Sequence, residues 1–210
     1  MNQETDVAPV GRIGKQAMRC NIGRMMNRTL STALLLLSIA IPASAQQSAP
    51  QGPPTVTGFL RNLYNGNKNS VLRVAERMPE EFYGLRPGTQ EEVRTFGQHV
   101  AHIASYNFLW CSQAKGEANP NAGRDLEKTL KSKAEIIKAV TDAFAYCDAV
   151  YAALTDASGA EVITITQENG RQQQQTRAGL LMLNVVHSNE TYGSMVTTLR
   201  MKNISPQPAR

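Results

Sequence analysis

This 210-residue chain contains three histidines, whose side chains could take part in chemistry because of their type and spacing. His99 and His102 lie one turn apart on one predicted helix, and His187 lies on another. Histidines on facing helices are a common way to build a metal site in a helical bundle. The alternative is that one histidine is a hydrogen-bonded core residue while the others are half-exposed. Spacing alone leaves both interpretations open.

The helix that carries His187 has polar residues where a bundle helix normally has Leu, Ile, Val or Ala. Its predicted inward stripe reads Leu180, Leu183, His187, Thr191, Ser194 and Thr198. Spacings of three and four residues keep these positions on one side of a helix. A buried polar group costs about 1–3 kcal/mol unless it is paired. We therefore expect a polar cavity or ligand site inside the bundle.

Four segments with apolar residues at helical spacing must position these side chains. Their approximate bounds are 55–78, 95–115, 125–154 and 176–202. Proline at position 79 ends the first segment, and Thr95 is a suitable N-cap for the second. The expected inward stripe of the first segment is Leu60, Leu63, Val71, Val74 and Met78, interrupted by Asn67. The sequence thus predicts an all-α, four-helix bundle.

A short excursion separates the third and fourth helical segments. Residues 162–166 are rich in β-branched side chains, and Asn169-Gly170 is a turn signal. This pattern predicts a short hairpin or extended segment over residues 161–175.

The first 45 residues resemble an export segment. An apolar run at 34–41 follows Arg28 and is followed by Pro-Ala-Ser-Ala at 42–45. This order is typical of a secretory signal peptide cut after Ala45, preceded here by an upstream extension. The run is shorter than the roughly 20 residues that span a bilayer, so no stable membrane insertion is expected after cleavage. An uncleaved anchor is the alternative.

The remaining chain then divides into a flexible linker at 46–54 and the bundle at 55–206, with a periplasmic or secreted location.

The charge pattern excludes one class of partner. The formal net charge is +5, but five of the 22 basic and only two of the 17 acidic residues fall in 1–45. In the remainder, acids and bases alternate, as at Glu127-Lys128, which is typical of a solvated mixed surface. We expect no nucleic-acid binding.

Several motifs, taken in order, resemble DinB-like proteins. Residues 77–83 (RMPEEFY), Arg86-Pro87 and 94–103 (RTFGQHVAHI) resemble the first half of that family. Residues 187–193 (HSNETYG) and 199–206 (LRMKNISP) resemble its last helix. The resemblance covers about 55–206 and implies a four-helix bundle with up-down-down-up topology. Many members bind a divalent metal, and known relatives include mycothiol-dependent isomerases and bacillithiol transferases.

The resemblance implies a ligand set that this chain only partly keeps. The family's usual ligands are one histidine on the second helix and an HxxxH pair on the fourth. They correspond here to His102, His187 and Thr191, and a neutral threonine is a poor ligand for zinc or nickel. In the implied antiparallel packing, His99 would approach the space at Thr191 and complete a three-histidine site, with water and Glu190 nearby. The alternative is that His99 points to the flank and that metal affinity is weak or absent.

The two cysteines after residue 45 are Cys111 and Cys147. Both lie near the C-terminal ends of the second and third helices, which run parallel in the implied topology. An oxidising compartment permits a disulfide between them. Two buried, unpaired thiols are the alternative.

Two functions remain open from the sequence. The first is a metal-binding protein (Zn, Ni or Fe) with hydrolase or thiol-transferase chemistry, in which the metal activates water or a thiol. The second is a non-catalytic bundle that binds a small molecule or a partner without metal. No Ser-His-Asp pattern, phosphate loop or nucleotide motif is present. A homodimer is expected on the same resemblance.

Overall fold

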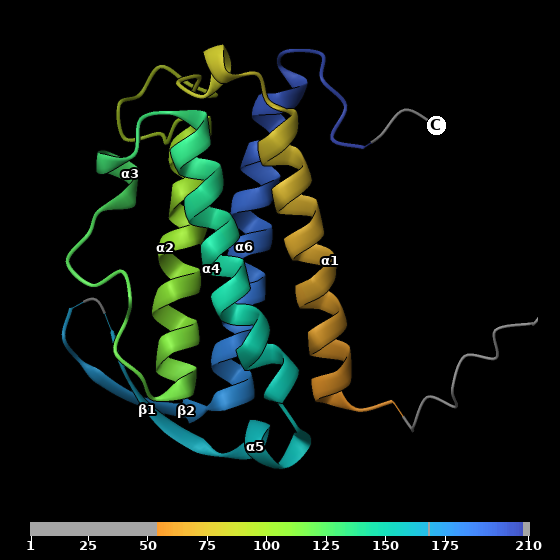
Figure 1. The fold of residues 1–210 in the computed structure, drawn as a ribbon, viewed down its shortest axis with the longest axis vertical. Helices are drawn as coiled ribbons and strands as arrows, with labels where there is room; N and C mark the ends of the chain where they lie inside the picture. The colour runs from red at the N-terminus through yellow and green to blue at the C-terminus, as the bar shows by residue number, and fades with distance from the viewer. Residues whose placement is uncertain (1–53, 168, 208–210) are drawn as a thin grey trace, which may run out of the picture. The chain divides into compact units, whose positions relative to one another are not determined.

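Four long helices pack side by side in the computed structural model, which describes residues 54–167 and 169–207. They are α1 (Val56–Arg77), α2 (Phe96–Lys115), α4 (Lys133–Ala153) and α6 (Arg177–Arg200). In Figure 1, α1 and α6 run upward, while α2 and α4 both run downward. Helices α1 and α2 each pack against both α4 and α6. The helical fold class expected from the sequence is confirmed, and the described residues also form a small two-stranded sheet within the predicted excursion.

Each long helix begins at a hydroxyl side chain that accepts a backbone N–H of the first turn. The N-caps are Thr55, Thr95, Ser132 and Thr176. At Thr95 and Ser132 the third helical residue, Gln98 or Glu135, bonds back to the cap and completes a capping box. Helix α2 ends at Lys115, and its C-cap is Gly116, whose φ of 74° is in the left-handed region that favours glycine. These local signals explain why the helix starts follow the sequence closely.

The single long helix predicted over 125–154 is wrong in one respect. The structure divides it into the one-turn helix α3 (Leu126–Thr129) and α4, because Leu130 leaves the helical conformation. Asp125 caps α3 and Ser132 caps α4, so both helix starts are satisfied separately. The short 3₁₀ helix η1 (Glu80–Phe82) follows α1 after Pro79 and has no side-chain cap. The break at Leu130 lets α3 lie against α2.

The excursion before α6 contains a helical turn and a hairpin. Helix α5 (Asp156–Ala160) comes first, and β1 (Val162–Thr166) then pairs antiparallel with β2 (Gln172–Thr176). Thr176 ends β2 and also caps α6, so the hairpin leads directly into the last helix. Gln113 Nε2 donates to the carbonyl of Thr166 at 2.9 Å and ties the hairpin to α2. The hairpin therefore covers the end of the bundle at which α2 ends (Figure 1).

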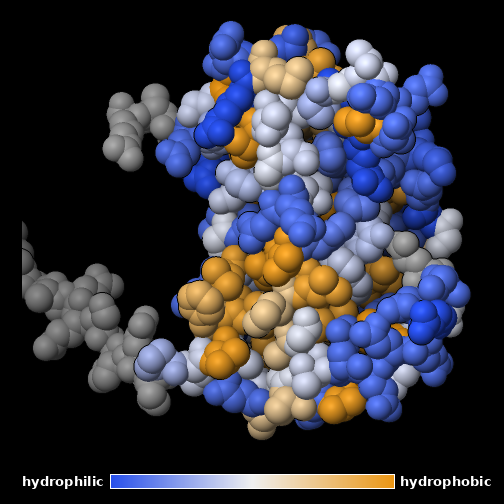
Figure 2. Space-filling model, turned by 180° about the vertical axis from the view of Figure 1, so that it is seen from behind, coloured by the Kyte–Doolittle hydropathy of each residue, from blue (hydrophilic) through white to orange (hydrophobic). Residues whose placement is uncertain are grey.

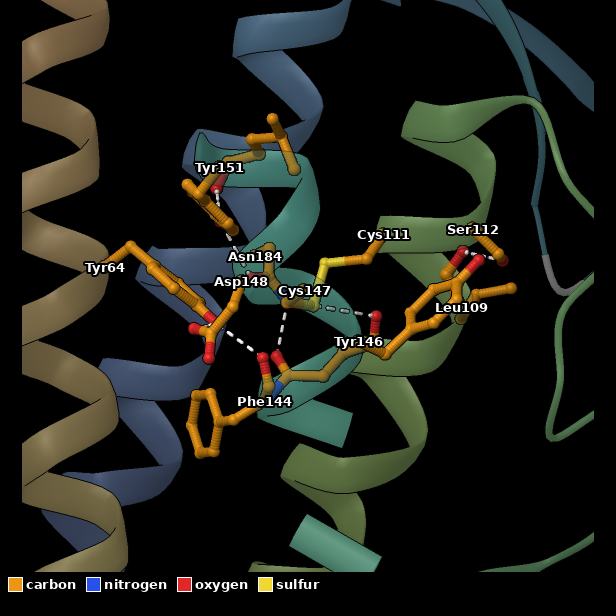
Figure 3. The surroundings of a disulfide bond; sticks show 12 residues. Tyr64, Leu109, Cys111, Ser112, Phe144, Tyr146, Cys147, Asp148, Tyr151 and Asn184 are labelled. Carbon is orange, nitrogen blue, oxygen red and sulfur yellow. Dashed lines mark hydrogen bonds between the residues drawn. A yellow bond between two sulfur atoms is a disulfide. The ribbon is translucent and has the colours of Figure 1, made fainter. Parts of the chain in front are cut away.

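A disulfide and a chain of polar groups cross the middle of the core. Cys111 of α2 and Cys147 of α4 are bonded to each other, with Cα atoms 5.4 Å apart and both residues fully buried. The Tyr151 hydroxyl lies within 2.9 Å of Asn184 Oδ1, and Asn184 Nδ2 donates to Asn107 Oδ1 at 2.8 Å. Figure 3 shows Tyr151 and Asn184 beside the disulfide. The core thus joins α2, α4 and α6 by covalent and polar links as well as by apolar packing.

Some large apolar side chains remain on the surface. On the neighbouring helices α1 and α6 they are Val56, Phe59, Leu63, Met182, Leu183 and Val186. Figure 2 shows apolar side chains gathered in the lower half of one face of the molecule. Among the described residues, no helix combines the length and the apolar character that crossing a bilayer requires. The predicted signal peptide at 1–45 and almost all of the linker at 46–54 lie outside the described residues.

Candidate functional site

His102 and His187 face each other between α2 and α6. Their Nε2 atoms are 2.9 Å apart, which is a hydrogen-bond distance. Two aromatic rings of α2 surround this pair, with Tyr106 4.6 Å from each imidazole centroid and Trp110 5.1 Å from that of His187. His102 is buried and His187 is half-buried. The structure therefore brings together two of the three histidines that the sequence singled out.

A carboxylate that sequence reasoning placed on the solvated surface completes this cluster. Glu127 of α3 lies with Oε1 2.5 Å from His102 Nδ1, and its Oε2 accepts from Arg94 Nε at 2.6 Å. Burial by itself would raise the pKa of Glu127, but the hydrogen bonds from His102 and Arg94 outweigh it and hold the pKa below its usual value. Glu127 is therefore ionised near neutral pH. No local pattern marks this residue, because the contact depends on how α3 docks against α2.

The three side chains form one directed hydrogen-bond chain. An ionised Glu127 accepts Nδ1–H of His102, so a neutral His102 presents Nε2 as an acceptor. His187 then donates its Nε2–H to His102. A carboxylate that accepts from Nδ1–H in this way fixes the tautomer and the orientation of the imidazole.

The third histidine does not join the pair. No group of three or more His, Cys, Asp or Glu side chains in residues 54–167 and 169–207 could hold a metal ion. Thr191, at the remaining ligand position, is buried and donates its hydroxyl to the carbonyl of His187 at 3.0 Å. Glu190 is exposed. In this structure His99 therefore does not supply the ligand that is missing at Thr191.

The donor set of the described residues is one protein ligand short of the usual catalytic metal site in this structure. Catalytic zinc sites normally have three protein ligands, and here two imidazoles converge. Two nitrogens bound to one tetrahedral ion, each about 2.0–2.1 Å from it, would lie about 3.4 Å apart. The observed 2.9 Å between the Nε2 atoms is instead the length of a direct hydrogen bond.

The inward stripe predicted for the last helix is partly wrong. Leu183 is 44% exposed, and His187 and Ser194 are half-buried at the flank. The buried polar residues of α6 are Asn184, Ser188, Thr191 and Thr198. The core face is shifted from the predicted one toward Leu181, Asn184 and Ser188, while Leu180, Thr191 and Thr198 are buried as predicted. Leu63 of α1 is likewise exposed, while Tyr64 and Asn67 are buried and Asn67 donates to Asn189.

A cavity of about 420 Å³ opens in front of the aromatic rings. Its walls come from α2, the hairpin and the start of α6, and apart from Thr166 its side chains are apolar, aromatic or amide. They are Tyr106, Leu109, Trp110, Gln113, Ile165, Thr166, Gln167, Asn169, Gln173, Gln175 and Leu183. The volume is within the range of small-molecule sites, about 300–1,000 Å³. Because Tyr106 and Trp110 also contact His187, they separate the cavity from the histidine pair.

His99 gives a pH prediction of its own. Burial, with the charges of Arg94 and His102, lowers the pKa of His99 from 6.5 to about 4, although Glu127 opposes the shift. Between those two pH values the unfolded chain binds a proton that the folded chain does not, so stability falls as the pH falls. We expect the free energy of unfolding to drop more between pH 7 and pH 5 in the natural protein than in His99→Gln. Urea unfolding of both proteins at the two pH values measures this difference, and equal drops would contradict it.

Comparison with known proteins agrees with this architecture. The model of the DinB superfamily matches residues 64–195. The fold is similar to the crystal structure of a DinB-like protein from Bacillus subtilis, with a TM-score of 0.55 and 18% identity over 72% of this chain and 96% of that one. A DinB-like protein from Bacillus cereus has a TM-score of 0.55 and 16% identity over 74% of this chain and 98% of that one. No protein of curated function matches the sequence. The chain belongs to the DinB superfamily.

Proposed function

We propose that this protein is a non-catalytic bundle that binds an uncharged small molecule in the cavity between α2, the hairpin and α6. The observation that carries the proposal is the cavity of about 420 Å³ with an aromatic and amide lining. Tyr106 and Trp110 provide an aromatic wall, with ring centroids 4.7 Å apart and ring planes tilted by 55° to each other. Next to these rings, Glu127 is hydrogen-bonded to His102, and His102 is hydrogen-bonded to His187. This is the second of the two functions left open by the sequence.

Calorimetric titration with acetylnaphthalene, an uncharged aromatic ketone, tests the proposal. We expect saturable one-to-one binding that weakens about tenfold in Trp110→Ala, because the variant removes an aromatic wall. Phe59→Ala is the matched control, since Phe59 is an exposed aromatic outside the lining of the cavity. Circular dichroism checks that each variant is folded. Absence of binding to the natural protein, or equal binding by Trp110→Ala, would overturn the proposal.

A divalent-metal protein is the second candidate, and one observation favours it. The Nε2 atoms of His102 and His187 converge, and Glu127 backs His102 as carboxylates back many metal ligands. Zinc, nickel or iron bound there would supply Lewis-acid activation of water or a thiol. Elemental analysis of residues 46–210, prepared without a histidine tag, separates the two candidates. Near-stoichiometric metal that disappears in His187→Ala would favour the metal protein, and unchanged affinity in His99→Ala would exclude His99 from it.

We further propose that the protein acts in the periplasm or outside the cell. The leader-like composition of residues 1–45 supports this location, as does a buried disulfide, which persists mainly in oxidising compartments. Fusion of residues 1–54 to alkaline phosphatase, which is active only after export, tests it.

The apolar surface of α1 and α6 supports a homodimer, because contiguous exposed apolar patches commonly mark interaction sites. Sedimentation equilibrium of the natural protein and of Phe59→Ser is the test, and a natural monomer would reject the dimer.

A further inference from the structure

The hairpin of β1 and β2 has two outer edges, and its hydrogen bonds show which backbone groups point outward. At one end of the ladder the N–H of Gln167 donates to the carbonyl of Arg171 at 2.8 Å, and at the other the N–H of Arg177 donates to that of Glu161 at 2.9 Å. Hydrogen-bonded and non-bonded pairs alternate along an antiparallel ladder, so three pairs direct their N–H and C=O groups outward. They are Val162–Thr176, Thr164–Gln174 and Thr166–Gln172.

The two edges differ in what covers them. On the β1 edge the outward carbonyl of Thr166 accepts from Gln113 Nε2 at 2.9 Å, so this edge lies against α2. On the β2 edge, no backbone hydrogen bond from the described residues outside the hairpin reaches Gln172 or Gln174, and both residues are exposed. An open strand edge is a template for pairing with another chain. Strand β2 therefore has backbone donors and acceptors available for a further strand.

Strand β2 lacks the charged side chains and the proline that edge strands commonly carry against such pairing. Its five residues read QQQQT. Arg171 lies outside the strand, and Arg177 is paired with Glu161 at 2.6 Å. Four successive glutamines also make the strand complementary to itself, because each side-chain amide can both donate and accept. The composition of this edge therefore favours a second copy of the same strand as its partner.

We propose that β2 pairs antiparallel with β2 of a second copy, so that two hairpins form one four-stranded sheet. This inference rests on the proposed homodimer and assigns its interface. The register that uses the whole strand places Gln174 opposite the same residue of the second copy, and Gln172 opposite Thr176. The outward N–H and C=O groups of the two Gln174 residues then bond to each other reciprocally, as a two-fold axis requires.

The apolar surface of α1 and α6 adjoins this edge and supplies area that a short strand lacks. A stable interface buries about 800 Å² on each partner, which is more than five paired residues provide. Leu183 belongs to the apolar surface and also lines the cavity together with Gln173 and Gln175, so that surface reaches the hairpin. Met182 follows Thr176 after about 9 Å along the axis of α6. Strand pairing thus sets the register of the dimer, and the apolar side chains add buried area.

Charge substitutions at Gln174 test the pairing by sedimentation equilibrium. Like charges directly opposite each other destabilise a strand pair. We expect Gln174→Lys and Gln174→Glu each to raise the Kd of the dimer about tenfold. An equimolar mixture of the two variants should restore association, since opposite charges then face each other. Circular dichroism checks that each variant is folded.

Thr164→Lys is the matched control. Thr164 is the register partner of Gln174, so the same charge is placed on the same face of the hairpin but on the edge that lies against α2. The Kd of the dimer should change by less than about twofold, because an exposed charge away from the pairing edge contributes little. An effect as large as that of Gln174→Lys would overturn the assignment of the β2 edge.

The remaining outcomes separate this inference from the proposals on which it rests. If the natural protein is a dimer and Gln174→Lys forms an equally tight one, the strand pairing is wrong while the dimer stands. Failure of the mixed variants to associate would likewise reject the pairing. A natural monomer rejects the dimer and the pairing together. Binding of acetylnaphthalene is measured separately, so the proposed small-molecule function does not depend on any of these results.

Discussion

Replacing both Cys111 and Cys147 with alanine is expected to lower the free energy of unfolding by about 3–4 kcal/mol. The two residues are 36 positions apart, and the disulfide removes the corresponding loop-closure entropy from the unfolded chain. In a folded domain of this size the loss corresponds to a decrease in Tm of about 10 °C. Urea and thermal unfolding of the oxidised natural protein and of the double variant measure the effect.

Reduction of the natural protein is the control for this prediction. With the thiols free, its unfolding midpoint should move close to that of the double alanine variant, since both lose the same cross-link. Both sulfur atoms belong to fully buried residues, so reduction is expected to be slow unless the protein is first unfolded. A loss below about 1 kcal/mol in the double variant would mean that the unfolded chain gains little freedom without the bond.

Asn184→Leu is expected to cost about 2–3 kcal/mol, the second-largest effect. Asn184 is almost fully buried, and its Nδ2 is the donor to Asn107 Oδ1. Asn107 Nδ2 already has no partner among the described residues, so the substitution leaves both ends of a buried amide unpaired. Tyr151 is affected less, because its hydroxyl also lies 2.7 Å from the carbonyl of Leu181. Urea unfolding measures the loss.

A double-mutant cycle separates lost pairing from altered packing. Asn107→Leu combined with Asn184→Leu removes both amides, so no unpaired polar group remains at that point. The leucines are somewhat larger than the asparagines, but each single variant already includes its own packing cost. We expect the double variant to be more stable than the sum of the two losses predicts, by about 1 kcal/mol or more. Simple additivity would show that the two amides do not act as a pair.

The disulfide and the asparagine pair also bear on the candidate site. Cys111 directly follows Trp110 on α2, and Asn107 directly follows Tyr106. Both links are therefore made by residues adjacent to the aromatic wall of the cavity. They hold α2 against α4 and α6 at the level where Tyr106 and Trp110 separate the cavity from the histidines. A binding site with rigid walls loses less conformational entropy when a ligand binds.

The starts of the helices could be predicted because their causes are local. Thr95 is followed three residues later by Gln98, and Thr55 and Thr176 each precede an apolar periodic run. The same logic, applied to Ser132 and Glu135, would have found the break between α3 and α4. The β-branched run before Asn169-Gly170 similarly identified the excursion that forms β1 and β2.

The exact face that each helix buries could not be predicted in the same way. Leu183 and Asn184 are adjacent in the sequence, and apolar spacing favoured Leu183 as the core residue. In the structure Asn184 is buried, because Tyr151 and Asn107 satisfy its amide, while Leu183 lines the cavity. A polar residue is acceptable in a core only when partners from other helices reach it. Periodicity contains no information about those partners.

For the candidate site too, some features follow from the local sequence and others only from tertiary packing. By itself the sequence determined the family and the helical class, and it singled out His99, His102 and His187 as candidate site residues, since these depend on residue types and local spacing. Only the tertiary structure decided that Glu127 bonds to His102 across 25 residues, and that His187 meets His102 across 85. It also decided that Gln113 and Gln175 line one cavity. Local spacing fixes the side of a helix on which a residue lies, but the rotation and docking of that helix result from packing the whole bundle.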